Sequence, residues 1–217
     1  MILKPLVIFD MDGVLVYPRS SWKVIHDHFG VDNEDSFLMY MDERIDDMEF
    51  MRRDISLWRK RKPDLDRYYL EDIFRGVKRM RGIDLAVKTI NDLGADNAIV
   101  SGGIDILADQ IASELPFRHV HANGFVTDTS GLLTGEGNLN VPLRNKGKVL
   151  KFLKDRGDYT HVVTIGDSLV DGTMFDLSDL SIGFRPMEDE VEEMVDVVVE
   201  GDDLSITVEL IRDWIGD

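Results

Sequence analysis

The sequence predicts an α/β fold: a Rossmann-like, doubly wound parallel sheet with a helical domain inserted after the first strand. Short apolar runs typical of buried strands alternate with stretches whose apolar residues recur at helical spacing. Strands that alternate with helices build parallel sheets covered by helices on both faces. Residues 17–81 depart from this alternation, because they show helical spacing and no convincing strand. We therefore expect a core over residues 1–16 and 82–217 and a helical insert over residues 17–81.

The strands are expected one after another along the core. The first is LVIFD, at residues 6–10, and it leads directly into the insert. Four further apolar runs follow, at residues 97–101, 161–167, 180–184 and 195–200. Helical spacing lies between most of these runs and within the insert, at residues 83–94, 104–115, 146–157, 188–195, 22–30, 36–60 and 66–80. Residues 124–137 alternate around a Thr-Ser-Gly turn, which favours a small hairpin attached to the core.

The composition is that of an ordinary globular protein. At 217 residues with 43% hydrophobic content, the chain is long enough to bury a sizeable core. No apolar run approaches the roughly 20 residues that cross a bilayer, and the first strand begins without the features of a signal peptide. We therefore expect a cytoplasmic protein with no membrane partner. The sequence has no cysteine, so any chemistry must use oxygen and nitrogen groups.

The strong negative charge limits the partners of the chain, whose formal net charge is -17. Nucleic acids and anionic membranes are bound by clustered lysine and arginine, so no nucleic acid is expected as a partner. A small anionic substrate is compatible with this charge if a local cation offsets the repulsion. The sequence leaves the oligomeric state open between monomer and homodimer.

Two carboxylates follow the first strand in the stretch VIFDMDGVLV. Asp10 stands at the strand end and Asp12 two residues further on, so in an extended chain both side chains lie on one face. One carboxylate can act as a nucleophile and form an acyl phosphate, and the other can donate and accept the proton. Gly13 suits a tight exit with close backbone approach. A polar turn that merely ends the strand is the alternative interpretation of this pair.

Polar residues also stand at the ends of two later strands. Ser101, with Gly102 and Gly103, follows the second strand and opens a helical pattern, so its hydroxyl and backbone N–H groups can face a phosphate. A plain helix N-cap is the alternative for this serine. Asp167 and Asp171 lie four residues apart and would share one face of a helical turn. Because such sheets bind ligands beyond the carboxyl ends of their strands, we expect these residues to share one site.

The chain resembles the haloacid dehalogenase-like (HAD) hydrolase superfamily at four ordered places. They are FDMDGVL with Asp10 and Asp12, VSGG with Ser101, RNKGK with Lys146, and TIGDSLVDGTMF with Asp167 and Asp171. Three motifs stand at strand ends and one at a helix start, as in the family. The stretches SGGIDILADQIASEL, HANGFVTDTSGLLTGE and RNKGK look like those of its phosphoserine phosphatase-like subgroup, and the insert matches the family's helical C1-type cap.

This resemblance implies a phosphatase that hydrolyses a small-molecule phosphomonoester through an aspartyl-phosphate intermediate. Asp10 would be the nucleophile and Asp12 the general acid and base, while Ser101 and Gly102 would bind the phosphate. Lys146 would offset repulsion between the phosphate and the nucleophile. Lys148 is the nearby alternative, and Lys146 is preferred because the lysine of related members precedes a glycine.

The resemblance also implies Mg²⁺ as the cofactor, an ion that prefers oxygen ligands and keeps several waters. Its implied ligands are the Asp10 carboxylate, the Asp12 backbone carbonyl and the Asp167 carboxylate. Asp171 would support the site by holding Lys146 or a metal-bound water.

Arginines in the insert bear on the substrate. Arg52 stands where the subgroup has an arginine for the substrate carboxylate, although Arg53 and a merely solvated role are alternatives. Arg19 stands where phosphoserine phosphatases carry a glutamate for the substrate amino group, and Val170 replaces an asparagine of the last motif. A cation cannot bind an ammonium. The substrate is therefore expected to be phosphoserine, phosphoglycolate or another small anionic phosphoester, with a preference for one whose second anionic group contacts Arg19 and Arg52.

Two rival functions share these core residues. In a phosphotransferase or phosphomutase, the aspartyl phosphate would pass to a hydroxyl acceptor instead of water. In a non-catalytic interaction module, the fold would serve a protein partner through the acidic run at residues 42–49. Phosphate release without an acceptor distinguishes hydrolysis from both.

Overall fold

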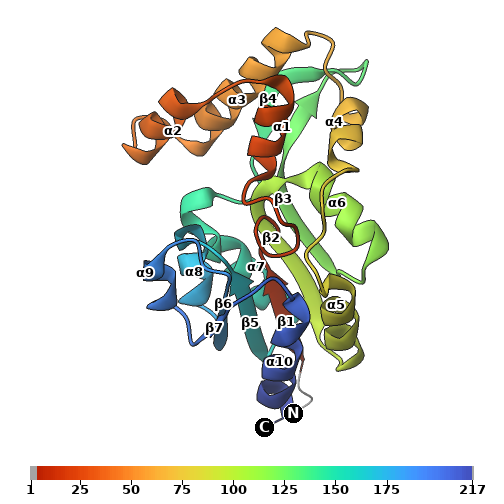
Figure 1. The fold of residues 1–217 in the computed structure, drawn as a ribbon, viewed down its shortest axis with the longest axis vertical. Helices are drawn as coiled ribbons and strands as arrows, with labels where there is room; N and C mark the ends of the chain where they lie inside the picture. The colour runs from red at the N-terminus through yellow and green to blue at the C-terminus, as the bar shows by residue number, and fades with distance from the viewer. Residues whose placement is uncertain (1–3, 217) are drawn as a thin grey trace.

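The computed structural model describes residues 4–216, which form a seven-stranded sheet with helices on both faces (Figure 1). The strand order is β4-β3-β2-β1-β5-β6-β7, and β1 lies at its centre. All neighbouring pairs are parallel except β3 and β4. The strands are β1 (Pro5–Phe9), β2 (Asp96–Ile104), β3 (His119–Thr127), β4 (Leu133–Asn138), β5 (His161–Gly166), β6 (Leu180–Phe184) and β7 (Val197–Val199). This topology confirms the predicted α/β, Rossmann-like fold.

Alternate residues of β1 build two apolar layers, because neighbouring side chains of a strand point to opposite faces. Val7 and Phe9 belong to one cluster with α5 (Ile83–Asp92), α6 (Asp105–Glu114) and α10 (Thr207–Gly216). Leu6 and Ile8 belong to the other cluster, with α7 (Gly147–Gly157) and Met174 of α8 (Gly172–Phe175). Shorter elements complete the core, namely α9 (Asp189–Glu192) and the 3-10 turns η1 (Leu143–Asn145), η2 (Leu169–Asp171) and η3 (Leu204–Ile206). Within residues 4–216, every helix is too short or too polar to cross a membrane.

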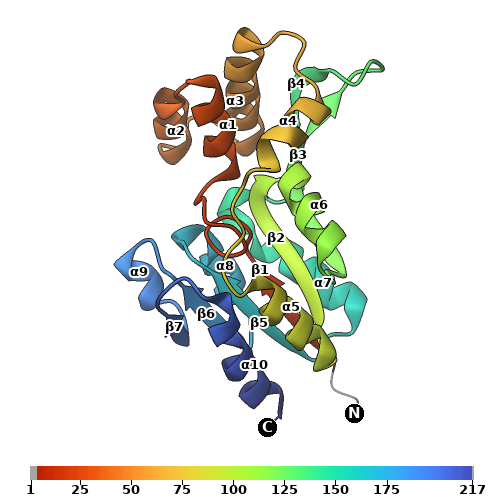
Figure 2. The same cartoon turned by 45° about the vertical axis from the view of Figure 1, so that its right-hand side comes forward.

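Residues 17–81 contain four helices that stand over the carboxyl edge of the sheet (Figure 2). They are α1 (Ser21–Phe29), α2 (Glu34–Met41), α3 (Asp47–Arg61) and α4 (Arg67–Phe74). The predicted helical stretch 36–60 divides into α2 and α3 at the acidic segment 42–46, where Glu43 has a positive φ of 59°. Asp46 then caps α3 by accepting a hydrogen bond from the backbone N–H of Glu49 at 2.8 Å.

The predicted hairpin is larger than expected and joins the core sheet to the insert. Its first strand, β3, begins at His119. The first half of β3 pairs with β2, and the second half extends beyond the core sheet toward α3. The backbone N–H of Leu133 donates to the carbonyl of Leu65 at 2.9 Å, and Arg59 donates to the carbonyl of Thr134 at 2.8 Å. The hairpin therefore holds α3 against an extension of the central sheet.

The sequence patterns did not predict two elements of the core. The core half of β3 has the sequence HVHAN, in which histidines and an asparagine interrupt the apolar pattern. Helix α10 follows the last strand and buries Val208 and Ile211 against the face that α5 covers. The β3 segment has no strong pattern of its own, so its structure depends on contacts with the sheet. Helix α10, by contrast, has apolar residues at helical spacing, at Val208, Ile211 and Ile215, and this pattern was overlooked.

Candidate active site

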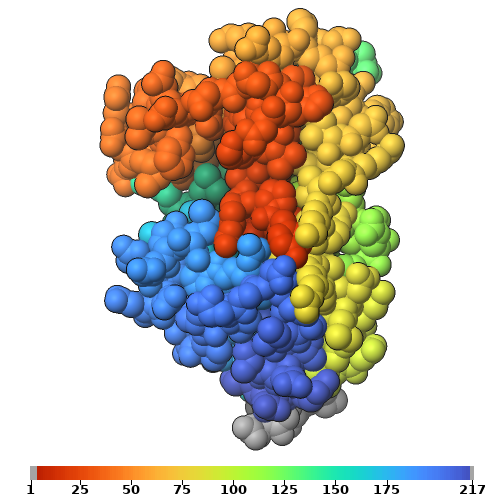
Figure 3. All heavy atoms as spheres, in the orientation of Figure 1, coloured from red at the N-terminus to blue at the C-terminus, as the bar shows by residue number. Residues whose placement is uncertain are grey.

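The candidate site lies at the carboxyl edge of the central strands. Asp10 directly follows β1, Ser101 lies near the end of β2, and Asp167 directly follows β5. The backbone N–H of Asp10 donates to the carbonyl of Ile165 in β5 at 2.9 Å, which fixes the start of the Asp10 loop. The space-filling view shows the insert above this edge, with a hollow between it and the C-terminal part of the core (Figure 3).

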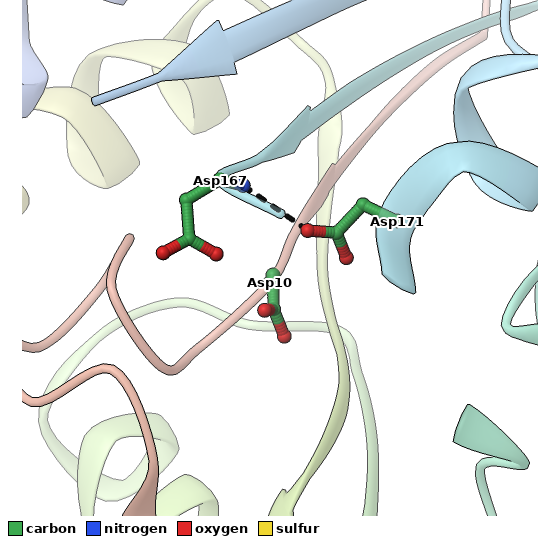
Figure 4. A group of neighbouring side chains, drawn as sticks. All are labelled: Asp10, Asp167 and Asp171. Atoms are coloured by element: carbon green, nitrogen blue, oxygen red, sulfur yellow. Dashed lines mark hydrogen bonds between the residues drawn. The ribbon is translucent and has the colours of Figure 1, made fainter. Parts of the chain in front are cut away.

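Three buried carboxylates meet at this edge. Asp10, Asp167 and Asp171 each have an oxygen within 4.8 Å of the other two (Figure 4). Burial, opposed in part by the charge of Lys146, raises the pKa of Asp10 to about 6. Burial and the charge of Asp10 raise the pKa of Asp167 to about 8. The cluster therefore favours a positive counter-charge, whether from protons, a side chain or a metal ion.

Lys146 supplies one such charge from inside the protein. Its Nζ lies 3.1 Å from Asp10 Oδ1 and 2.7 Å from Asp171 Oδ1, and its side chain is buried. Burial alone would lower the pKa of Lys146, but the charges of Asp10 and Asp171 raise it, so the ammonium persists. Asp171 Oδ2 also accepts hydrogen bonds from the backbone N–H groups of Asp167 at 3.0 Å and Ser168 at 3.2 Å. Asp171 is thus fully engaged in positioning Lys146 and the Asp167 loop.

Asp12 lies in a different environment. Its Oδ2 accepts two hydrogen bonds of 2.8 Å, from the backbone N–H and the hydroxyl of Ser21 at the start of α1. Burial and the charge of Asp10 raise the pKa of Asp12 to about 7. A carboxyl group with such a pKa can both give and take a proton at neutral pH. A Cβ at Gly103 would lie 2.5 Å from Asp12 Oδ2, so glycine is needed there to admit the carboxylate.

The Ser101 turn differs from the expected helix start. β2 continues to Ile104, which is the N-cap of α6, so Ser101 lies three residues too early to cap this helix. Its hydroxyl instead accepts a hydrogen bond from the backbone N–H of Gly103 at 3.1 Å. The prediction of a helix N-terminus at Ser101 was wrong because the strand remains paired past the two glycines, with an irregular register to β3 between Val100 and Ile104.

Polar groups from distant parts of the chain hold this turn. The carbonyl of Gly102 accepts hydrogen bonds from the Trp22 indole N–H at 3.1 Å and from the Asn123 amide at 3.2 Å. The same amide donates to the carbonyl of Val141 at 2.9 Å, in the segment that leads to Lys146. The contacts of Ser21, Trp22 and Asn123 were not predicted from the sequence, and the only local signal was that Trp22 begins the first helical stretch of the insert, at residues 22–30.

The donor set fits a hard cation. The Oδ1 atoms of Asp10 and Asp12 are buried and accept no hydrogen bond from residues 4–216, although the former forms the ion pair with Lys146. Gly13 has φ of 79°, and a Cβ there would lie 1.9 Å from Asp167 Oδ2, so the loop closes tightly over the Asp167 carboxylate. Oxygen ligands in this number suit Mg²⁺ and related ions.

The two arginines predicted to bind substrate lie in different places. Arg19 donates a hydrogen bond from Nη1 to Asp167 Oδ2, at the centre of the site. Arg52 lies on α3 and forms ion pairs with Glu136 at 2.9 Å and Glu49 at 2.6 Å. The structure therefore brings Arg19 to the acidic cluster, whereas Arg52 lies on the junction between α3 and β4.

Metal-free protein is expected to lose stability as the pH rises from about 4 to about 8. The folded pKa values of Asp10, Asp12 and Asp167 are about 6, 7 and 8, above their ordinary value of 3.8. Groups with raised folded pKa values contribute stability below the unfolded pKa, and this contribution is lost as the pH passes the folded values. Excess Mg²⁺ should therefore raise the thermal unfolding midpoint more at about pH 8 than at about pH 5.

The matched variant for this experiment is Asp167→Asn, which keeps the shape of the side chain and removes one charge. It should show a smaller Mg²⁺-dependent rise at the higher pH than the wild type. Equal rises at both pH values in the wild type would contradict competition between protons and metal at this cluster.

Comparisons with known proteins agree with the site. A family model described as haloacid dehalogenase-like hydrolase matches residues 7–176. The phosphoserine phosphatase of Methanocaldococcus jannaschii is 27% identical over 216 residues, which are 96% of this chain and 98% of that protein. A solved structure of a substrate-bound phosphoserine phosphatase complex has a TM-score of 0.81 at 25% identity, covering 97% of this chain and 99% of that one.

A phospho-aspartyl intermediate analogue of phosphoserine phosphatase is equally similar, with a TM-score of 0.81, 25% identity and coverage of 96% of this chain and 99% of that one. Family and relatives together indicate an enzyme of the phosphatase class. The chain therefore belongs to the haloacid dehalogenase-like hydrolase family, in its phosphoserine phosphatase-like subgroup.

Proposed function

We propose that the protein hydrolyses a small phosphomonoester in two steps through an aspartyl phosphate on Asp10. The observation that carries this proposal is the pairing of a buried Asp10 with Lys146, whose Nζ lies 3.1 Å from Asp10 Oδ1, beside an Asp12 whose pKa is about 7. A nucleophilic carboxylate, a fixed cation and a proton donor are the groups that this reaction needs.

In the first step, an Asp10 oxygen forms a bond to phosphorus while the bond from phosphorus to the ester oxygen breaks. Asp12 gives its proton to the departing oxygen, and Lys146 stabilises charge on the phosphoryl oxygens. Ser101 and the backbone of Gly102 bind the phosphate. In the second step, Asp12 takes a proton from water, the water oxygen bonds to phosphorus, and Asp10 is released with inorganic phosphate.

We infer that Mg²⁺ is the cofactor. Its ligands would be the carboxylates of Asp10 and Asp167 and the backbone carbonyl of Asp12. When bound, it supplies positive charge that offsets the repulsion between the phosphate and Asp10. Helices α1–α4, within residues 17–81, would act as the cap that excludes water from the charged site. The core would then comprise residues 1–16 and 82–217.

The substrate is proposed to be phosphoserine, phosphoglycolate or another small anionic phosphoester. The similarity to phosphoserine phosphatases supports the first. Arg19, which stands where those enzymes have a glutamate for the amino group, favours a substrate with a second anionic group instead. Arg52 remains a proposed contact for such a group, and it would have to leave Glu136 to make it. A cytoplasmic location and the lack of a nucleic-acid partner stay predictions from charge and composition.

A screen of phosphorylated metabolites for Mg²⁺-dependent phosphate release tests this function. The wild type should release phosphate from at least one small anionic phosphoester without an added acceptor. Formation of a new phosphoester from an added hydroxyl acceptor, with no release of inorganic phosphate when the acceptor is absent, would indicate a phosphotransferase. Failure with every phosphoester, together with a folded and metal-binding protein, would contradict the proposal and favour an interaction module.

A further inference from the structure

The acidic cluster is neutralised from two sides by cations of different kinds. Lys146 is buried on the inner side and bonds both Asp10 and Asp171. Arg19 approaches from the outer side and bonds Asp167 alone. The Arg19 side chain is 31% exposed, whereas that of Asp167 is 3% exposed. The Lys146 ammonium is thus buried in the protein interior, whereas the Arg19 guanidinium is accessible to solvent.

The backbone around Arg19 is held firmly. The N–H of Gly13 donates to the carbonyl of Pro18 at 2.7 Å, which closes the loop before Arg19. Two residues after Arg19, the N–H of Ser21 donates to Asp12 Oδ2 at 2.8 Å. The arginine stem runs close to the loop, since a Cβ at Gly13 would lie 3.0 Å from Arg19 Cδ. The guanidinium can therefore move by side-chain rotation while its backbone stays fixed beside the site.

The Asp167 carboxylate has no second way to be neutralised by a side chain in the described structure. Its backbone N–H is bound to Asp171, whose own oxygens are used by Lys146 and by the Asp167 loop. A divalent ion held by Asp167 would lie next to the present position of the guanidinium, and the two positive charges would repel each other. Metal binding at Asp167 and the Arg19–Asp167 ion pair therefore compete.

We propose that Arg19 is an exchangeable counter-ion that leaves Asp167 when the metal binds and then binds an anionic group of the substrate other than the transferred phosphate. This proposal rests on the proposed function and names its substrate class, a phosphomonoester with a carboxylate or a second anion. Metal binding and substrate binding then favour each other. The metal displaces the Arg19 guanidinium from Asp167 and so frees it for the substrate anion, and the substrate anion holds the guanidinium away from the metal. Such coupling is reciprocal in free energy.

Calorimetric titration of metal-free protein with Mg²⁺ alone tests the competition. Arg19→Gln should bind Mg²⁺ about tenfold more tightly than the wild type, since the lost ion pair is partly exposed. Arg19→Lys keeps the charge and should stay within about threefold of the wild type. Lys23→Gln is the matched control, because it removes an exposed positive charge four residues away whose only ion pair among residues 4–216 is with Asp27. Its Mg²⁺ affinity should be unchanged.

Steady-state kinetics with two monoesters test the substrate contact. With Mg²⁺ saturating for both enzymes, Arg19→Gln should raise KM for phosphoglycolate, which carries a carboxylate, about tenfold more than it raises KM for phenyl phosphate. Equal or weaker Mg²⁺ binding by Arg19→Gln, or equal effects on both monoesters, would overturn the proposal.

The two readouts separate this proposal from the proposed function. If the wild type hydrolyses phenyl phosphate but Arg19→Gln binds Mg²⁺ no more tightly, the counter-ion role fails and the phosphatase function stands. If the wild type hydrolyses no phosphoester of the metabolite screen while Arg19→Gln gains Mg²⁺ affinity, the competition stands and the function fails. Absence of Mg²⁺ binding by all variants would contradict both.

Discussion

Replacement of Asp10 by asparagine is expected to lower the rate of phosphate release by about 10⁴-fold or more, because the amide cannot form the aspartyl phosphate. The fold should persist, since asparagine keeps the size of the side chain and removes a charge that repels Asp167. The loss of the ion pair with Lys146 acts in the opposite direction. We therefore expect a change of unfolding midpoint within about 2–4 °C, which corresponds to about 1 kcal/mol.

The measurement combines phosphate release with thermal unfolding of the same preparations. Asp176→Asn is the control, because Asp176 is an exposed aspartate just after α8 and should keep wild-type rates. Beryllium fluoride should form an adduct on Asp10 of the wild type and none on the variant. Full activity of Asp10→Asn, or an adduct on another side chain, would remove Asp10 from its proposed role.

Asp10 and Asp167 were predicted from the sequence to lie close together, and they do so in the structure because parallel strands share a carboxyl edge. Asp10 and Asp167 each end an apolar run, so the alternation of strands and helices was enough to bring them together. The Asp171 carboxylate was expected to contact either Lys146 or a metal-bound water, and in the structure it contacts Lys146. Local patterns thus predict which side chains lie close together when strands and helices alternate regularly to form a parallel sheet.

The contacts that set the detail of the site were not predictable from local patterns. Asn123 lies within β3, whose sequence pattern is weak, yet its amide links the Gly102 turn to Val141 across the edge of the sheet. Trp22 is the second residue of α1 in the insert, and its indole donates to the same turn. The partner of Arg19 is 148 positions away in the chain. These interactions depend on tertiary packing. The spacing of apolar residues in the sequence indicates only which face of a helix or strand is buried.

Lys146→Met is expected to destabilise metal-free protein by about 3–5 kcal/mol near neutral pH, because it leaves Asp10 and Asp171 buried without their shared cation. The pKa of Lys146 is raised in the folded state, so the ion pair contributes its full stability at neutral pH. Asp10, with a pKa of about 6, takes up a proton in acid, and the need for the cation then falls. The destabilisation should therefore be smaller at about pH 5 than at about pH 8.

The same variant should lower kcat by about 10²–10³-fold under conditions where it is folded, since one fixed charge that stabilises the phosphoryl oxygens is lost. Lys148→Met is the matched control, because Lys148 lies two residues further on, is exposed, and was the alternative candidate in the sequence. Denaturant unfolding at the two pH values and phosphate release compare the two variants. A loss of stability that does not depend on pH, or a larger loss of activity in Lys148→Met, would show that the buried ammonium is not the charge on which the cluster depends.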